Sequence, residues 1–114
     1  MSYLSISFTH KNTDIKMREK LAFSDDAAVE TFLKTMYENE VITEAVLLST
    51  CNRVEIMTTV NSITSGQNFI ISCLSKYSGI EFDTLFERAD IYDNTSAIHH
   101  LFTVASALDS LVIG

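Results

Sequence analysis

The stretch that decides the fold is residues 45–60, AVLLSTCNRVEIMTTV. Ala45 to Leu48 and Val54 to Val60 each favour a strand, because apolar and β-branched residues fit a pleated, half-buried surface. The joint between them, residues 49–53, contains Asn52, which is typical of tight hairpin turns. The same joint also carries a thiol, Cys51, and a guanidinium, Arg53. The stretch therefore predicts a β-hairpin with reactive side chains at its joint.

The chain on either side of this hairpin alternates between strand and helix patterns. Residues 3–9 alternate apolar and polar side chains with the period of a half-buried strand. Asp14 and Ser24 are placed to cap two helices before the hairpin, and Asp25 and Asp26 suit the start of the second. After the hairpin, residues 61–66 are expected to form a loop. A helix at 67–77 ending near glycine 79, a helical turn at 82–86, a strand at 91–92 and a helix capped by residue 95 or 96 follow.

This order of elements predicts an α+β fold. It is the β-α-β-β-α-β order of the ferredoxin-like split βαβ sandwich, with one helix added at the C-terminus. A chain of 114 residues fits one domain, residues 1–114, large enough to bury a core. The last helix is still strongly apolar where the sequence stops, which favours a domain cut from a longer protein.

Composition limits the possible functions. Apolar residues make up 46% of the chain, which is ordinary for a globular protein, and the formal net charge is −7. That charge opposes a broad nucleic-acid surface, which needs clustered Lys and Arg. Four basic residues do fall between positions 11 and 20. They indicate either a solvated helix face balanced by Asp14 and Glu19, or a local contact with phosphates or another domain.

The first strand begins almost at the first residue, so no secretory signal is expected and a reducing, cytoplasmic setting follows. No apolar stretch approaches the length of a membrane span, and no membrane partner is expected. The glycines, Gly66, Gly79 and Gly114, are isolated from one another. A dinucleotide fingerprint needs several glycines within six residues, so no nicotinamide cofactor is expected in a Rossmann turn of this chain.

Cys51 is the first candidate for chemistry. A cysteine is often a buried structural residue, and Cys73, within an apolar helical run, is predicted to be one. Cys51 instead has polar neighbours and stands at a strand end, where a side chain can reach a cleft. Arg53, two positions on, would point to the same face of an extended segment and would lower the thiol pKa. From the residues alone Cys51 is a candidate nucleophile, and the alternative that it is a structural thiol stays open.

The histidines are His10, His99 and His100. In the last helix His99 shares a polar stripe with Ser110, and His100 lies at the edge of that stripe. A stripe of this kind is more often solvated than functional. No spacing of Cys, His or carboxylates resembles a zinc motif, so no metal is expected.

Three stretches of the chain resemble one enzyme family. Residues 47–56, LLSTCNRVEI, are similar to the catalytic-cysteine motif of glutamyl-tRNA reductase, which opens a route to tetrapyrroles. Residues 9–23, THKNTDIKMREKLAF, resemble the family's N-terminal segment, and residues 100–114, HLFTVASALDSLVIG, resemble the helix after its active-site histidine. The likeness runs through the whole chain in the family's order.

The resemblance implies a mechanism. The thiolate of Cys51 would attack the ester between glutamate and its tRNA, giving a thioester that NADPH, bound by a separate domain, reduces to glutamate-1-semialdehyde. Arg53 and Thr50 would hold the glutamyl group, since a guanidinium grips a carboxylate in two places. His100 would assist proton transfer at the ester, and Ser110 would lie near the substrate. Glutamyl-tRNA as substrate, a homodimer of the full-length protein and glutamate-1-semialdehyde aminomutase as a partner are also implied.

The chain departs from the family pattern at several positions. Residues 12–14 are Asn-Thr-Asp where the family commonly has Thr-Ala-Pro, and the chain has no proline. Thr103 and Ala107 stand where arginine and glycine are frequent, which puts a tRNA contact near residue 103 in doubt. The NADPH and dimerisation domains are missing, so this chain alone is not expected to complete the reduction. The alternative readings are an RRM-like RNA-binding module, disfavoured by the charge and by the lack of an RNP1 pattern, and a regulatory domain without catalysis.

Overall fold

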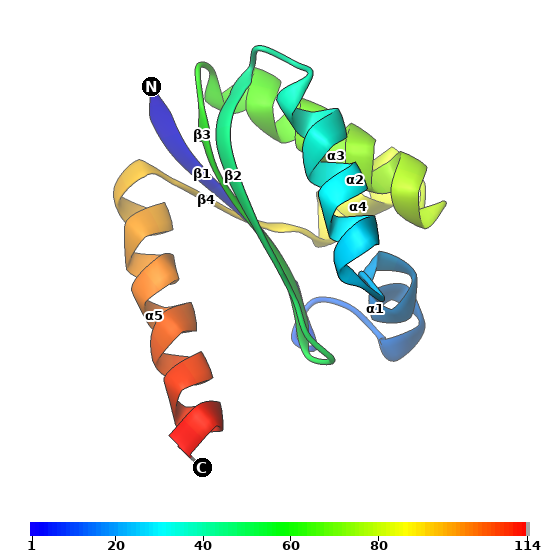
Figure 1. The fold of residues 1–114 in the computed structure, drawn as a ribbon, viewed down its shortest axis with the longest axis vertical. Helices are drawn as coiled ribbons and strands as arrows, with labels where there is room; N and C mark the ends of the chain where they lie inside the picture. Colours follow the sequence, from blue (N-terminus) through cyan, green and yellow to red (C-terminus); the bar gives the residue numbers. More distant parts are fainter. Residues whose placement is uncertain (114) are drawn as a thin grey trace.

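The computed structural model describes residues 1–113, and side chains over residues 1–107. Figure 1 shows a single sheet between two unequal layers of helices. The strands are β1 (Ser2–Thr9), β2 (Ile42–Ser49), β3 (Arg53–Val60) and β4 (Asp90–Asp93). The helices are α1 (Ile15–Leu21), α2 (Asp26–Tyr37), α3 (Ile63–Ser78), α4 (Phe82–Arg88) and α5 (Asn94–Ile113).

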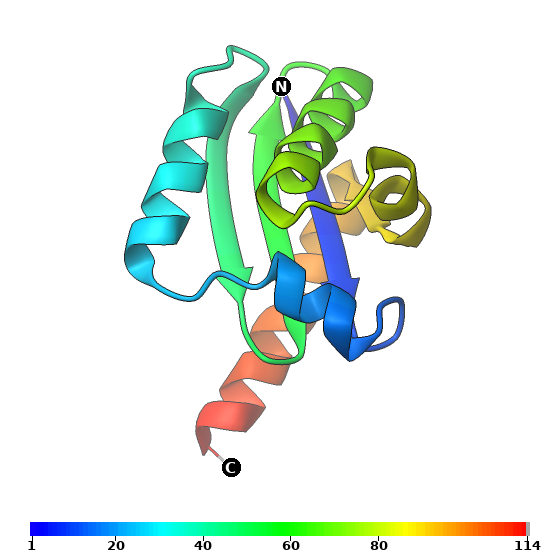
Figure 2. The ribbon, with the colours of Figure 1, turned by 90° about the vertical axis from the view of Figure 1, so that its right-hand side faces the viewer.

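The four strands form one sheet in the order β2-β3-β1-β4, and every neighbouring pair is antiparallel. The predicted α+β class is therefore confirmed. Helices α1 to α4 cover one face of the sheet, and α5 lies alone against the other (Figures 1 and 2). The two faces are consequently built from different kinds of residue.

Alternation along the central strands sorts their side chains between these faces. On β1, Leu4, Ile6 and Phe8 are fully buried toward α1–α4, and on β3 their cross-strand partners include Val54 and Ile56. Burying one such side chain contributes about 1.5–3 kcal/mol. The residues between them, which include Ser5, Ser7 and Glu55, are also buried but face α5. The hydrophobic core thus lies on one side of the sheet, and a polar layer lies on the other.

Of the three predicted helix N-caps, the first was correct and the other two were wrong. Asp14 caps α1 as expected, accepting from the backbone N–H of Met17 at 2.8 Å, but α2 is capped by Asp25 and not by Ser24. A capping side chain must reach an N–H two or three residues ahead, and Asp25 reaches that of Ala28 at 2.8 Å, whereas Ser24 stands one residue too early.

Helix α5 likewise starts at Asn94, not after Thr95 or Ser96. Asn94 has a φ of 46°, so the chain passes from β4 straight into the helix without an extended capping residue. The hydroxyl of Ser96, inside the helix, accepts from the backbone N–H of Asp93 at 3.1 Å and donates to its carbonyl at 2.9 Å.

The expected loop at 61–66 was also wrong, because α3 begins at Ile63 with Ser62 as its cap. Gly66 lies inside the first turns of that helix. A Cβ built on Gly66 would come 2.8 Å from Cγ1 of Val60, so the glycine serves close packing of helix on strand and not a turn. The glycine expected to end α3 does so: Gly79 has a φ of 77°. Among the helices that the structure describes, none has both the length and the hydropathy needed to cross a bilayer.

Candidate functional site

The β2–β3 joint is a turn closed by Thr50. The backbone N–H of Thr50 donates to the carbonyl of Arg53 at 2.8 Å. Its side-chain oxygen accepts from the N–H groups of Asn52 and Arg53, each at 3.2 Å. Thr50 therefore fixes the turn through its backbone and its hydroxyl oxygen, while the hydroxyl hydrogen is left to donate elsewhere.

This turn holds Cys51 out into solvent. The two cysteines are both free thiols, but Cys51 is exposed and Cys73 is buried in α3. Burial raises the pKa of the Cys73 thiol, an effect that the nearby Lys76 ammonium partly offsets. The prediction that Cys73 is a core residue is thus confirmed, and the structural-thiol alternative does not apply to Cys51.

Glu55 is the centre of the polar layer beneath α5. Its side chain is fully buried on β3, and Oε1 accepts from Ser7 Oγ at 2.6 Å and from Arg53 Nη1 at 2.9 Å. Two donors converging on one oxygen is the pattern that an ionised carboxylate accepts. Sequence reasoning missed Glu55, although a carboxylate in the middle of a β-branched strand is an unusual feature that invites a search for partners.

Helix α5 brings His100 to the same carboxylate. His100 Nε2 lies 3.0 Å from Oε2 and 3.1 Å from Oε1 of Glu55. The imidazole stacks on the ring of Tyr92 with centroids 4.0 Å apart and an interplanar angle of 11°. Burial raises the pKa of Tyr92, and the carboxylates of Asp90 and Glu55 raise it further. His99 is exposed, so the resemblance, which selects His100, agrees with the structure better than the helical stripe did.

The structure therefore groups the predicted residues in two neighbouring sets. Arg53 and His100 meet at Glu55, and Thr50 and Cys51 lie in the turn that immediately precedes β3. Cys51 sits in a turn, so the premise of an extended segment from Cys51 to Arg53 was wrong, and strand alternation does not place one side chain relative to the other. Arg53 is paired with Glu55. The side chain of Ser110 lies outside the described residues, and its role stays a prediction.

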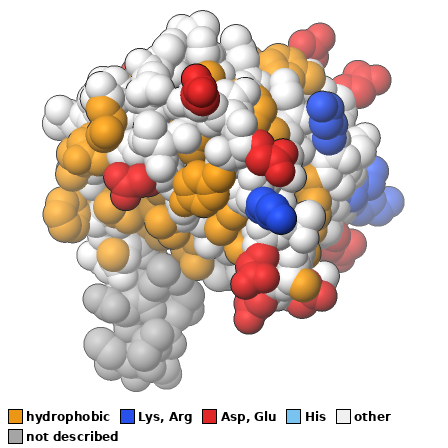
Figure 3. Space-filling model, turned by 45° about the horizontal axis from the view of Figure 1, so that its top comes forward, with side chains coloured by type: hydrophobic (Ala, Val, Ile, Leu, Met, Phe, Trp, Pro, Cys, Tyr) orange, Lys and Arg blue, Asp and Glu red, His pale blue; other side chains and the backbone are white. Residues whose placement is uncertain are grey.

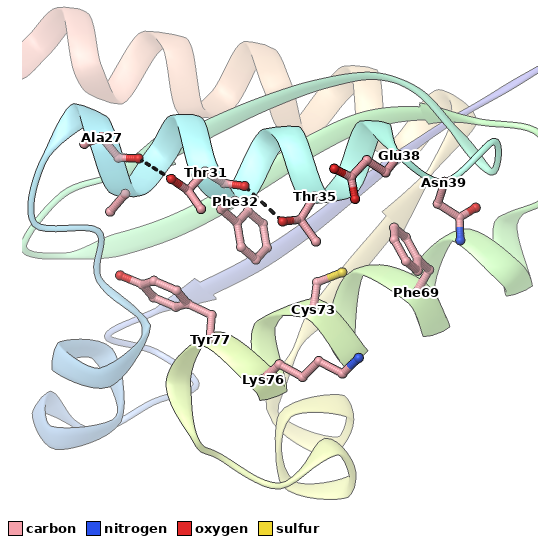
Figure 4. Close-up of a pocket in the computed structure, with 11 residues that line it drawn as sticks. Ala27, Thr31, Phe32, Thr35, Glu38, Asn39, Phe69, Cys73, Lys76 and Tyr77 are labelled. Carbon is pink, nitrogen blue, oxygen red and sulfur yellow. Dashed lines mark hydrogen bonds between the residues drawn. The ribbon is translucent and has the colours of Figure 1, made fainter.

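Hollows lie on both faces of the sheet. One of about 630 Å³ lies beside the imidazole and is lined by Tyr92, Thr95, Ser96, His99, His100 and Thr103. A larger groove of about 760 Å³ separates α2 from α3, where Phe32, Phe69 and Cys73 point into it (Figure 4). The second groove lies across the sheet from Glu55 and contains none of the predicted site residues.

Charge is dispersed on the face of the molecule in Figure 3, where basic side chains lie apart among acidic ones. Of the basic residues at positions 11–20, Arg18 is used within the fold, donating to the carbonyl of Thr13 at 2.6 Å, and the other three are exposed. Both interpretations of that cluster require exposed basic side chains, so the choice between them stays a prediction. Within the part of the chain whose side chains are described, no three Cys, His, Asp or Glu side chains come together as a metal site would require.

Comparison with known sequences gives the class of protein to which this site belongs. Residues 6–114 match the family described as "Glutamyl-tRNAGlu reductase, N-terminal domain". Because that match covers nearly all of the sequence, the chain belongs to this family, as the resemblance of its three motifs predicts.

Individual relatives agree. Proteins named glutamyl-tRNA reductase from Aliarcobacter butzleri and Campylobacter curvus are 61% and 55% identical over all 114 residues, which span 26% and 27% of those proteins. The solved structure of glutamyl-tRNA reductase from Methanopyrus kandleri superimposes with a TM-score of 0.63 at 26% identity, over 94% of this chain and 23% of that one. The chain thus spans about a quarter of the length of the relatives it matches.

Proposed function

We propose that this chain carries the acyl-transfer half of glutamyl-tRNA reduction. The thiolate of Cys51 attacks the carbonyl carbon of the glutamyl ester, the new S–C bond forms, and the C–O bond to the tRNA ribose breaks. The ribose oxygen leaves with a proton, and the glutamyl group stays on the enzyme as a thioester. The observation that carries this proposal is the placement of an exposed cysteine in a turn directly before the Arg53–Glu55–His100 cluster.

The neighbouring side chains supply the remaining tasks. Arg53 has five N–H donors, and one nitrogen is tied to Glu55, so other donors are available for the carboxylate of the glutamyl group. The hydroxyl hydrogen of Thr50 and the side chain of Ser110 complete the proposed substrate contacts. His100 moves a proton at the ester, which is the usual work of a histidine whose ring is held in place.

We do not assign the reducing step to this chain, because among the described residues neither glycine lies where a nicotinamide cofactor would need one. Gly66 lies within α3 and Gly79 ends it, so neither belongs to a phosphate-binding turn between a strand and a helix. We propose, as the resemblance implies, that NADPH is bound by a separate domain of a homodimeric cytoplasmic protein with glutamate-1-semialdehyde aminomutase as a partner. The ferredoxin-like assignment of the fold also belongs to this proposal, supported by the strand order β2-β3-β1-β4.

The RNA-binding alternative is not favoured, because the family match covers residues 6–114 and the net charge is −7. The regulatory alternative would leave Cys51 without a function. These readings differ in what they predict for the thiol, so the thiol is the place to test them.

The test is to mix the chain with tRNA carrying labelled glutamate and to measure protein-bound label after acid quenching. We expect one glutamyl group per chain, released by hydroxylamine as a thioester is. Cys51→Ala should abolish the label, and Cys73→Ala, the matched control, should retain it. Absence of label on the folded wild-type chain, or label that survives in Cys51→Ala, would refute the proposed function.

A further inference from the structure

Glu55 is a buried charge whose partners come from three different elements. A carboxylate removed from water is tolerated when charged and polar donors replace its hydration. Here Ser7 on β1, Arg53 on β3 and His100 on α5 take that place. Because these donors belong to separate elements, Glu55 fixes their side chains relative to one another.

The geometry also determines which nitrogen of His100 carries a proton. Nε2 lies within 3.1 Å of both carboxylate oxygens, and Oε1 already accepts from Arg53 and Ser7. An ionised carboxylate accepts hydrogen bonds and donates none, so Nε2 must carry the hydrogen. In a neutral imidazole the other nitrogen, Nδ1, is then the acceptor.

The surroundings of the ring leave Nδ1 available. Over the described side chains, residues 1–107, His100 has hydrogen bonds through Nε2, and its ring face is covered by Tyr92. The hollow of about 630 Å³ opens beside this ring. The charged or titratable groups around the imidazole are Glu55, Arg53, Tyr92, Asp90 and the neighbouring His99.

We propose that Glu55 is the positioning residue of this site: it holds His100 by Nε2–H, so that Nδ1 is the nitrogen that exchanges a proton with the substrate. The same carboxylate holds the Arg53 guanidinium, so the proton carrier and the carboxylate clamp keep a fixed separation. This inference rests on the proposed function for the identity of the substrate. The orientation of the imidazole does not depend on it.

The first arm of the experiment reads the ring directly, by long-range ¹H–¹⁵N correlation NMR on the chain labelled at histidine. For neutral His100 we expect a single Nε2–H form with a downfield, slowly exchanging proton, lost in Glu55→Gln. The exposed His10 and His99 should show no such proton. Glu44→Gln, which removes an exposed carboxylate of β2, is the matched control and should leave the His100 signals unchanged. An Nδ1–H form of wild-type His100, or a Glu55→Gln spectrum like that of the wild type, would overturn the proposal.

The second arm measures the rate at which Cys51 takes the glutamyl group from tRNA. Glu55→Gln should lower this rate by about 100-fold, the lower part of the range that positioned proton transfer contributes. Glu44→Gln should leave it unchanged. Equal rates for Glu55→Gln and wild type would overturn the positioning role. If the wild-type chain takes no glutamyl group while His100 shows the expected proton, the proposed function fails and the assigned orientation of His100 stands.

Discussion

Gly66→Ala should destabilise the fold, although the same change inside a helix is normally stabilising. Replacing glycine by alanine in a helix gains about 0.5–1 kcal/mol. Here the new Cβ would lie 2.8 Å from Val60 Cγ1 and 3.2 Å from Leu4 Cδ2, well inside the optimal carbon–carbon separation of about 3.5–4.0 Å. Overpacking of this kind costs about 1–3 kcal/mol. The net loss should lie between about 0 and 2.5 kcal/mol, with a middle value of about 1 kcal/mol, and each kcal/mol lost should lower Tm by about 4–8 °C.

Removing the nearest clashing atoms should reduce the loss of stability caused by Gly66→Ala. Val60→Ala alone should cost about 2 kcal/mol, because two buried methyl groups are lost. In that background the 2.8 Å contact with Cγ1 is gone and the tip of Leu4 can shift, but the Cβ of residue 60 stays 3.1 Å from the new Cβ. Gly66→Ala should then cost much less than in the wild-type background, which makes the two substitutions coupled.

Urea unfolding followed by circular dichroism measures all four proteins of this cycle. The helix-propensity term is measured separately in the same helix by comparing Asn68→Gly with Asn68→Ala, because Asn68 is exposed. If Gly66→Ala raised stability in the wild-type background, or had the same effect in both backgrounds, the packing explanation for this glycine would be refuted.

Three further outcomes are expected. An alkylating thiol reagent should modify Cys51 rapidly and Cys73 slowly, because Cys73 is mostly buried and burial raises the pKa of its thiol. Mass spectrometry of the native and urea-unfolded chain checks this, and equal rates for the two cysteines in the native chain would contradict it. Tyr77→Phe should lower the free energy of unfolding, measured with urea, by about 1 kcal/mol, because it removes the hydrogen bond of 2.8 Å to the carbonyl of Ala22 and keeps the stack on Phe23. No loss of stability would show that the hydrogen bond contributes nothing. The pKa of Tyr92 is raised, so the folded state favours the neutral phenol; the resulting contribution to the free energy of unfolding is complete below pH ~10 and is lost as the pH rises through the folded pKa. Ultraviolet titration should show a late phenol that disappears in Tyr92→Phe and titrates earlier in Glu55→Gln. An unchanged curve in both variants would count against the assignment.

The strands and helices could be predicted because their signals are local. Alternation along residues 3–9 and the apolar period of α2 need no knowledge of the rest of the chain. Gly66 was misread because its requirement is set by Val60 and Leu4, which become neighbours only when α3 packs on the sheet. A glycine needed for close approach and a glycine needed for a turn look identical in sequence.

The site was predictable in part for the same reason. Thr50, Cys51 and Arg53 are adjacent in sequence, so their grouping at one joint could be inferred directly. Glu55 was missed because its partners Ser7 and His100 are 48 and 45 residues away. The resemblance supplied His100, but neither periodicity nor motif showed that its partner would be a buried carboxylate.

On strand β3 the even-numbered residues face the hydrophobic core and the odd-numbered residues face the polar layer. Val54 and Ile56 belong to the core under α1–α4, whereas Arg53 and Glu55 face α5. Chemistry could therefore be redesigned on the odd positions with little change to the folding core. The same arrangement makes an insertion or deletion in the turn at Thr50 doubly harmful, because a slip of one residue would carry Glu55 into the hydrocarbon layer and Val54 into the polar one.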